Sequence, residues 1–291
     1  MITGASGMLG SHLASFYKTH CDVIGVYRQH LIEIEGVRMV QADLSEGDQV
    51  NRLIDTYLPD ELIHCAALVD IDRCERDPLQ AYRQNVLPVE NIVRSLQGKD
   101  IKLVFISTDG VYSSNPVKHT EEEIEDPVHE YGRSKLKGEK LALSLKGAVA
   151  LRTTFFNSGT VLKKSFFEQI ISSLARGQKV RGFNDAFSSP LYVCDLVKII
   201  GQVLEKDLKG VFNAGASNGV SKFDLLCQMA ESLGLNAGLI EPISVDSLSL
   251  EARRNKNSTM NVEKISVALG MKMPEVKEMV ARFAKDFRKV A

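Results

Sequence analysis

Short apolar runs alternate with stretches of helically spaced apolar residues along the first half of the chain. The runs predict β-strands at 23–27, 37–42, 62–67, 102–106 and 148–152. The helical spacing predicts helices over 8–19, over 78–96 and around residue 131. Regular alternation of strands and helices is typical of an α/β fold with a doubly wound parallel sheet.

The pattern becomes less regular after Arg152. Helices are predicted at 166–174, 223–233 and 277–287, with one short strand at 211–215. No internal repeat or low-complexity linker separates this part from the rest. We therefore expect a large domain over 1–153, to which 188–215 returns, and a smaller interleaved C-terminal lobe formed by 154–187 and 216–291.

A glycine-rich turn, residues 3–10, stands between the first apolar residues and the first helix. Gly4 permits a tight turn, Gly7 allows a phosphate to approach the backbone, and Gly10 lets the helix pack close to the strand. Such a turn can be an ordinary loop, but its position before a helix and a second strand favours a dinucleotide-binding (Rossmann) domain, with the pyrophosphate at the helix N-terminus. The first strand is a stub of about two residues where about five are usual, so either the chain starts late or the sheet tolerates the stub.

The second strand ends in Tyr27 and Arg28. An acidic residue there binds the ribose hydroxyls of NAD, whereas an arginine can hold the 2′-phosphate of NADP. NADP(H) is the preferred cofactor and NAD(H) remains open, with an incidental exposed arginine as the alternative.

Tyr131 and Lys135 lie four residues apart and therefore share one helix face. An ammonium about 4 Å from a phenol, at an effective dielectric of about 20, favours the phenolate by roughly 4 kcal/mol. We therefore expect the pKa of Tyr131 to fall towards neutrality, where acid-base catalysis is efficient. A solvated helix face with an incidental lysine is the alternative for this pair taken alone. A further run, Ser107-Thr108-Asp109, follows an apolar strand and is expected at the carboxyl edge of the sheet, where ligands bind.

In this order, the glycine turn, Ser107-Thr108-Asp109 and the Tyr131 motif resemble the extended short-chain dehydrogenase/reductase family. Within it, the chain looks most like the dTDP-4-dehydrorhamnose reductases. Four stretches carry this similarity, at 66–75, 107–112, 131–139 and 184–192. The chain departs from the usual pattern at 186–191 and at Phe155, where a tryptophan is common, so the exact sugar stays open.

The resemblance implies a function and a set of site residues. It implies an NADP-dependent reductase of a nucleotide-linked 4-keto-6-deoxysugar, in the biosynthesis of deoxysugar or polysaccharide precursors. Catalysis would rest on Thr108, Tyr131 and Lys135, and substrate contacts on Asp109, Thr154 and Phe155. Local capping and strand-end packing are alternatives for Asp109 and Thr154, and bracing of the sheet is the expected role of Asn85. The implied cofactor contacts are Gly4, Ser6, Gly7, Met8, Leu9, Gly10, Tyr27, Arg28, Asp43, Leu44, Cys65, Ala66, Ala67, Asn85, Tyr131 and Lys135.

Two other functions stay open. A sugar-nucleotide epimerase or dehydratase is the nearest enzymatic alternative, although those dehydratases usually carry a glutamate where this chain has Gly110. A regulatory NADP-binding subunit without catalysis, like the β subunit of methionine adenosyltransferase, is the alternative from a different class.

Composition adds few constraints. The 36 basic and 37 acidic side chains among 291 residues give a net charge of −1, which offers no attraction for nucleic acid or an anionic membrane. Five scattered cysteines, no leader sequence and no apolar run of about 18 residues indicate a reduced, cytoplasmic protein without a membrane span. We expect no metal site, leave a homodimer open, and interpret the acidic segment 120–127 as a solvated loop.

Overall fold

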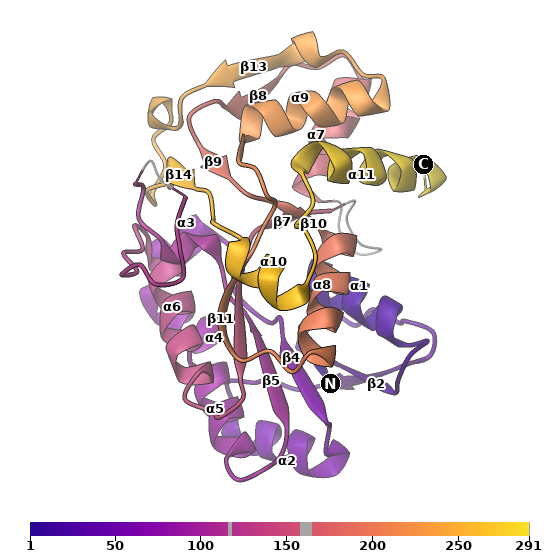
Figure 1. Cartoon of the computed structure of the whole chain (residues 1–291), viewed down its shortest axis with the longest axis vertical. Helices are drawn as coiled ribbons and strands as arrows, with labels where there is room; N and C mark the ends of the chain where they lie inside the picture. Colours follow the sequence, from indigo (N-terminus) through magenta and orange to yellow (C-terminus); the bar gives the residue numbers. More distant parts are fainter. Residues whose placement is uncertain (116–117, 158–164, 291) are drawn as a thin grey trace.

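Seven parallel strands form the central sheet of the chain (Figure 1). The computed structural model describes residues 1–115, 118–157 and 165–290. The strands are β1 (Ile2–Thr3), β2 (Val23–Tyr27), β3 (Val37–Gln41), β4 (Glu61–His64), β5 (Lys102–Ile106), β6 (Val149–Thr153) and β11 (Gly210–Ala214). Their order is β11-β6-β5-β4-β1-β2-β3, so the strand order reverses between β1 and β4. The predicted doubly wound parallel sheet is confirmed, and the reversal marks the edge where ligands bind in such sheets.

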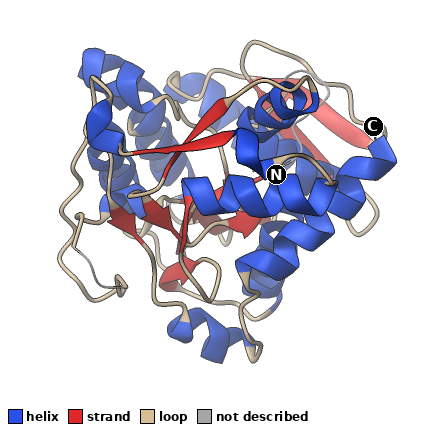
Figure 2. Ribbon diagram, turned by 90° about the horizontal axis from the view of Figure 1, so that it is seen from above, coloured by secondary structure: helices blue, strands red, loops and turns tan. Residues whose placement is uncertain are grey.

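Helices cover both faces of this sheet (Figure 2). One face carries α2 (Gly47–Tyr57), α5 (Leu87–Leu96) and α6 (Glu130–Ala142), and the other carries α1 (Met8–Tyr17) and α8 (Val193–Glu205). Alternate strand residues serve the two layers: Leu103 and Phe105 pack under α5, whereas Val104 and Ile106 pack with α1 and α8. This period-two alternation with apolar residues on both sides explains why the strands are nearly continuous apolar runs.

The stub at the start of the sheet is accommodated at its centre. Ile2 pairs with Gly25 of β2 on one side and with Ile63 of β4 on the other. A two-residue β1 is therefore enough to join the two halves of the sheet.

The stretch predicted as one helix over 78–96 is two helices, α4 (Pro78–Asn85) and α5, so that prediction is wrong. The break falls at Val86, two residues before Pro88. A proline lacks the N–H that would bond to the carbonyl of residue 84, and its ring clashes with that carbonyl. Pro88 instead fits the first turn of a new helix, as Pro78 does in α4 after its cap Asp77.

The acidic segment 120–127 is not a solvated loop, so that interpretation is also wrong. Glu121 accepts a hydrogen bond from the backbone N–H of Asn213 at 2.7 Å, and Glu123 bonds to the ring of the buried His119 at 2.8 Å. Glu125 forms a 2.5 Å ion pair with the buried Arg152. Alternate glutamates face the protein, while Ile124 is 93% exposed.

Most of the C-terminal segments build the upper part of the molecule in Figure 1, where the helices α7 (Phe166–Ala175), α9 (Lys222–Leu233) and α11 (Val276–Val290) lie. The helix α10 (Glu263–Leu269) lies lower, beside β11. The short strands of these segments are β7 (Phe155–Phe156), β8 (Val180–Phe183), β9 (Phe187–Ser188), β10 (Leu191–Tyr192), β12 (Val220–Ser221), β13 (Ile240–Ile243) and β14 (Asn257–Ser258). They pair in three small sheets, β10-β7, β12-β9-β14 and β13-β8.

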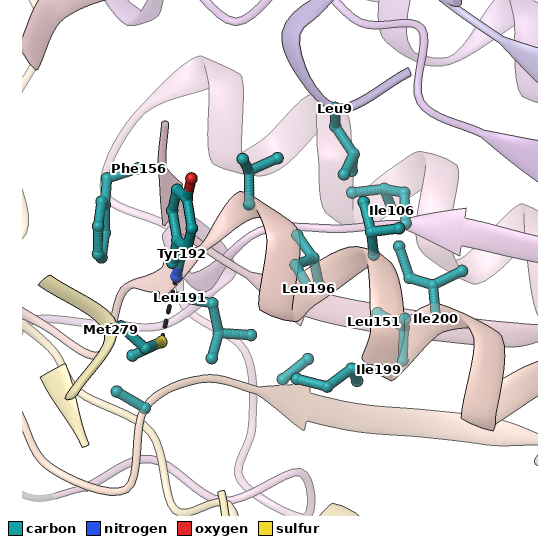
Figure 3. Packing of buried hydrophobic residues seen from close by; sticks show 14 of the residues in the cluster. Leu9, Ile106, Leu151, Phe156, Leu191, Tyr192, Leu196, Ile199, Ile200 and Met279 are labelled. Carbon is teal, nitrogen blue, oxygen red and sulfur yellow. Dashed lines mark hydrogen bonds between the residues drawn. The ribbon is translucent and has the colours of Figure 1, made fainter. Parts of the chain in front are cut away.

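One hydrophobic core joins these segments to the central sheet (Figure 3). Leu196 and Ile200 of α8 pack in one cluster with Leu9 of α1 and with Ile106 of β5. The same cluster continues through Tyr192, whose backbone N–H donates to the sulfur of Met279 at 3.2 Å. Across the described ranges 1–115, 118–157 and 165–290, no helix has the length and apolarity of a membrane span.

Candidate active site

The glycine-rich turn lies at the reversal point of the sheet. Gly4 has φ +66°, and a Cβ on it would lie 2.8 Å from the backbone nitrogen of Ala66. A Cβ on Gly10 would lie 2.2 Å from the carbonyl oxygen of Gly4. Both glycines are therefore required by close backbone contacts, in agreement with the expected tight turn and close helix packing.

A first cleft opens above this turn. Ten of the expected cofactor residues line it: Gly4, Ser6, Gly7, Tyr27, Arg28, Asp43, Leu44, Cys65, Ala66 and Ala67. Met8, Leu9 and Gly10 do not line it; Leu9 is in the core, and Gly10 packs beneath the turn. Asn85 braces the structure: its side chain accepts from the N–H of Leu68 at 2.7 Å and donates to Ser134 at 2.9 Å.

One end of the first cleft is basic. Arg28 lies there with Arg83 and His30, and its guanidinium donates to Gln84 at 3.5 Å. Asp43, the acidic residue of this cleft, already accepts hydrogen bonds from the N–H and hydroxyl of Ser45. The surroundings of Arg28 therefore suit an anionic group such as a 2′-phosphate.

A second cavity lies at the carboxyl ends of β5 and β6. It brings together Thr108, Asp109, Tyr131 and Thr154, all expected site residues. Phe155 does not line it, because its side chain packs against the hydrophobic core. The cavity also contains residues that the sequence reasoning missed: Ile71, His129, Phe183, Lys222, Arg254, Asn255 and Ser258. Of these residues, only His129 could have been assigned to the site from the sequence, because it lies two residues before Tyr131. The others come from segments distant from the motifs.

Tyr131 and Lys135 differ from the expected pair. Lys135 is buried and its Nζ lies 4.2 Å from the centre of the Phe105 ring. Burial raises the pKa of Tyr131 well above its usual value, and a hydrogen bond with Thr108 opposes this rise only in part. Burial also lowers the pKa of Lys135 to about 8. The expectation that Lys135 brings the pKa of the phenol near neutrality is therefore wrong for this structure, in which desolvation is the largest influence on Tyr131 and Asp109 and Cys74 raise its pKa further.

Thr108 is held firmly beside Tyr131. Its hydroxyl oxygen accepts a hydrogen bond from the N–H of Gly110 at 3.1 Å and donates to Asp109 at 3.2 Å. Asp109 accepts a second bond from Ser258 at 2.7 Å. Burial raises the pKa of the Asp109 carboxyl, although both hydroxyls act to lower it. Asp109 therefore joins β5 to β14 and also faces the cavity.

A buried ion pair between Glu139 and Arg152 lies beside the carboxyl end of β5. Glu139, two turns along α6 from Tyr131, accepts from Ser107 at 2.5 Å and from Arg152 at 2.6 Å. Arg152 also donates to the hydroxyl of Tyr112 at 2.9 Å. Because Ser107 directly precedes Thr108, this network fixes the end of β5 against α6. Within residues 1–115, 118–157 and 165–290, no group of three or more His, Cys, Asp or Glu side chains is arranged to hold a metal ion.

Comparisons with known proteins agree with this architecture. A family model described as RmlD substrate binding domain matches residues 1–289. The probable low-salt glycan biosynthesis reductase Agl14 of Haloferax volcanii is 28% identical, covering 98% of this chain and 97% of its own. The dTDP-4-dehydrorhamnose reductase of Aggregatibacter actinomycetemcomitans is 27% identical, covering 93% of each chain. The methionine adenosyltransferase 2 subunit beta of Rattus norvegicus is 27% identical, covering 99% of this chain and 89% of its own.

Solved structures show the same arrangement. A hypothetical dTDP-4-dehydrorhamnose reductase from Sulfolobus tokodaii is 30% identical, with a TM-score of 0.83 over 94% of this chain and 95% of that one. The Bacillus anthracis dTDP-4-dehydrorhamnose reductase, solved in complex with NADP, is 25% identical, with a TM-score of 0.83 over 98% of both chains.

Proposed function

The chain belongs to the RmlD substrate binding domain family, and we propose that it is an NADP-dependent reductase of a nucleotide-linked 4-keto-6-deoxysugar. Its product would serve as a precursor of deoxysugars or polysaccharides. We further propose a cytoplasmic location, supported by five free cysteines, and a division into the large domain and the smaller substrate-binding lobe expected from the sequence.

The first cleft fits NADP on the evidence of its own residues. Gly7 is the N-cap of α1 and has no side chain to satisfy the first amide groups of the helix, which leaves them available to a pyrophosphate. Arg28, with Arg83 nearby, would hold the 2′-phosphate. Asp43 and Leu44 would lie along the adenine, and Lys135 would hold the nicotinamide ribose. When bound, NADPH supplies a hydride for the carbonyl carbon of the substrate.

The second cavity would hold the keto-sugar. Thr108 would turn its hydroxyl proton from Asp109 to the carbonyl oxygen of the substrate, a contribution commonly worth about 3 kcal/mol of transition-state stabilisation. Tyr131 would give its proton to that oxygen as the C–H bond forms, so that the ketone becomes an alcohol. The charge of Lys135 would stabilise the phenolate left on Tyr131 until solvent returns a proton.

The observation that carries this proposal is the convergence of Tyr131 and Thr108 on one cavity, with the phenol in its neutral form. A reductase needs a protonated tyrosine to give its proton to the new alkoxide, and the raised pKa of Tyr131 supplies it. Gly110, directly after Thr108 and Asp109, has no side chain that could act as the second acid or base of a dehydratase.

The test is NADPH oxidation, followed by absorbance, with a dTDP-4-keto-6-deoxysugar generated in situ. We expect turnover by the wild type and its loss in Tyr131→Phe, which removes the transferable proton but leaves the first cleft intact. NADPH binding, measured by its fluorescence, should be unchanged in the variant. A Phe variant that still turns over would remove the assigned role of Tyr131.

A regulatory role is the second candidate, favoured by the similarity to a methionine adenosyltransferase subunit along 99% of the chain. NADPH binding without turnover of any keto-sugar nucleotide, together with copurification of a larger partner, would support it over the reductase.

A further inference from the structure

His129 occupies an unusual position between the helix α6 and the substrate cavity. It is 3% exposed and is the N-cap residue of α6. Its ring also lines the second cavity, with its centre 6.0 Å from that of Tyr131. A Cβ on Gly110 would lie 3.0 Å from Cε1 of His129, so the outer end of the ring packs beside the Thr108–Gly110 turn.

The capping bond sets which nitrogen of the ring carries the proton. Nδ1 of His129 accepts a hydrogen bond from the backbone N–H of Gly132 at 2.9 Å. An acceptor nitrogen carries no proton, so a neutral ring must have its proton on Nε2. Protonating Nδ1 would break the cap and add a positive charge at the positive end of the helix dipole.

Burial favours the neutral ring. It lowers the pKa of His129, and Arg254 and Arg133 act in the same direction. A hydrogen bond between the ring and the backbone and the charge of Glu75 on α3 (Ile71–Arg76) act in the opposite direction and do not reverse the effect. At neutral pH the ring is therefore an uncharged donor through Nε2.

Capping accounts for Nδ1 but leaves Nε2 without a function. Within the described part of the chain, Nε2 of His129 has no hydrogen-bond partner. Because the ring lines the second cavity, its Nε2–H is available to donate to a ligand there. The ligand atom must be an acceptor, because the ring can only donate there.

We propose that His129 is a substrate-binding residue whose Nε2–H donates a hydrogen bond to the oxygen beside the carbonyl that is reduced. This inference rests on the proposed reductase function. In a 4-keto-6-deoxypyranose, the hydroxyl next to the carbonyl carbon is on C3, because C5 carries the methyl group and the ring oxygen. With Tyr131 and Thr108 on the carbonyl oxygen, His129 then recognises the 3-hydroxyl. The cavity thus selects α-hydroxyketones over simple ketones.

The test separates the two roles of the ring with two variants. His129→Asn keeps a good N-cap acceptor but is too short to reach the cavity, whereas His129→Ala loses both functions. We expect the Asn variant to melt within about 2 °C of the wild type and to bind NADPH normally, but to lose about tenfold in kcat/KM for the keto-sugar, as for one hydrogen bond. The Ala variant should also melt at a lower temperature.

A 3-deoxy substrate allows a double-mutant cycle, in which the histidine and the 3-hydroxyl are removed singly and together. The wild type should lose about tenfold in kcat/KM on it, whereas His129→Asn should treat the 3-hydroxy and 3-deoxy sugars nearly alike. ¹⁵N NMR of the wild-type imidazole should show a protonated Nε2 and an unprotonated Nδ1 at pH 7.5. Wild-type kcat/KM in His129→Asn, or equal losses on removing the 3-hydroxyl from both proteins, would overturn the inference. A wild type that reduces no keto-sugar nucleotide would instead reject the reductase function on which it rests.

Discussion

Tyr131 and Lys135 show how burial alters a pair of residues that looks simple in sequence. Four-residue spacing puts both on one face of α6, but it gives no measure of desolvation. Lys135 lies over the Phe105 ring near Cys65, and its pKa falls to about 8 mainly because of burial. The phenol stays neutral, as proton donation to an alkoxide requires. The pair thus holds a proton on Tyr131 and a charge on Lys135 that is easily lost.

The lowered pKa of Lys135 predicts a basic limb in the pH–rate profile. For NADPH, kcat/KM should be level up to about pH 8 and fall above it, because the free enzyme then loses the ammonium that we propose to hold the nicotinamide ribose. Tyr131 should not contribute to this limb, since its pKa is raised rather than lowered. Initial rates measured between pH 6 and 10 would show the limb.

Lys135→Arg is the matched control, because a guanidinium keeps its charge over this range. The limb near pH 8 should disappear in that variant, even where overall activity is reduced. An unchanged limb in Lys135→Arg would assign it to another group.

At the scale of elements, the sequence predicted the strands better than the connections between them. Strands such as β2 and β5 are buried on both faces, so their apolar runs have the bounds of the strands themselves. The helix predicted over 78–96 failed because apolar periodicity continues through Val86, whereas Pro88 interrupts the backbone hydrogen bonds. Apolar side chains can keep a helical spacing where the backbone hydrogen bonds of the helix are interrupted, so the spacing alone does not show that a helix is continuous.

The acidic segment shows a different limit of sequence reasoning. Its glutamates look like a solvated charge run because their partners are far away in the chain. Glu121 bonds to the backbone of Asn213, and Glu125 pairs with Arg152. Only the folded sheet, in which β11 lies beside β6, brings these partners to one place. Local composition contained no signal for this arrangement.

Because α1 packs closely on the glycine-rich turn, we expect one added methyl group at Gly10 to lower both the stability and the NADPH affinity of the protein. Gly10→Ala would place a Cβ 2.2 Å from the Gly4 carbonyl oxygen, which is rigid backbone. The gain of about 0.5–1 kcal/mol from replacing a helical glycine is outweighed by about 1–3 kcal/mol of overpacking. Urea unfolding should show a net loss of stability, and the Kd for NADPH should rise because the turn shifts.

Gly47→Ala is the control for this prediction. Gly47 begins α2, and its Cβ would lie 3.4 Å from the side-chain oxygen of Asn91, an ordinary contact. Stability and NADPH affinity should stay close to the wild type. Equal behaviour of the two variants would show that the close contact at Gly10 has no energetic consequence.

At the scale of the whole molecule, the fold completes a site that the motifs only begin. Thr108, Asp109, Tyr131 and Thr154 were predictable because they follow strands or lie on the motif helix. Lys222, Arg254 and Ser258 reach the same cavity from α9, a loop and β14. No spacing or composition links these positions, since their proximity depends on how β9 pairs with β12 and β14. The residues that we propose to be catalytic are therefore predictable from local sequence, whereas the residues that complete the cavity depend on the tertiary structure.

The shared core predicts that the two parts of the molecule unfold together. One hydrophobic cluster runs from Ile2 and Leu13 beside the central sheet to Met279 and Phe283 of α11, so neither part can lose its packing alone. The chain has no tryptophan, so Phe16→Trp on α1 and Phe166→Trp on α7 would report on each part separately. Urea curves from both fluorescence probes and from far-UV circular dichroism should coincide.

A cavity in the core tests the coupling directly. Met279 is completely buried, and Met279→Ala should cost about 2–5 kcal/mol in the free energy of unfolding. Placed in each tryptophan variant, it should move both urea midpoints down by the same amount, although Phe16 and Met279 lie in different parts of the molecule. A shift confined to the Phe166→Trp curve would mean that the C-terminal part unfolds on its own, and that the contact of α8 with α1 does not transmit the loss.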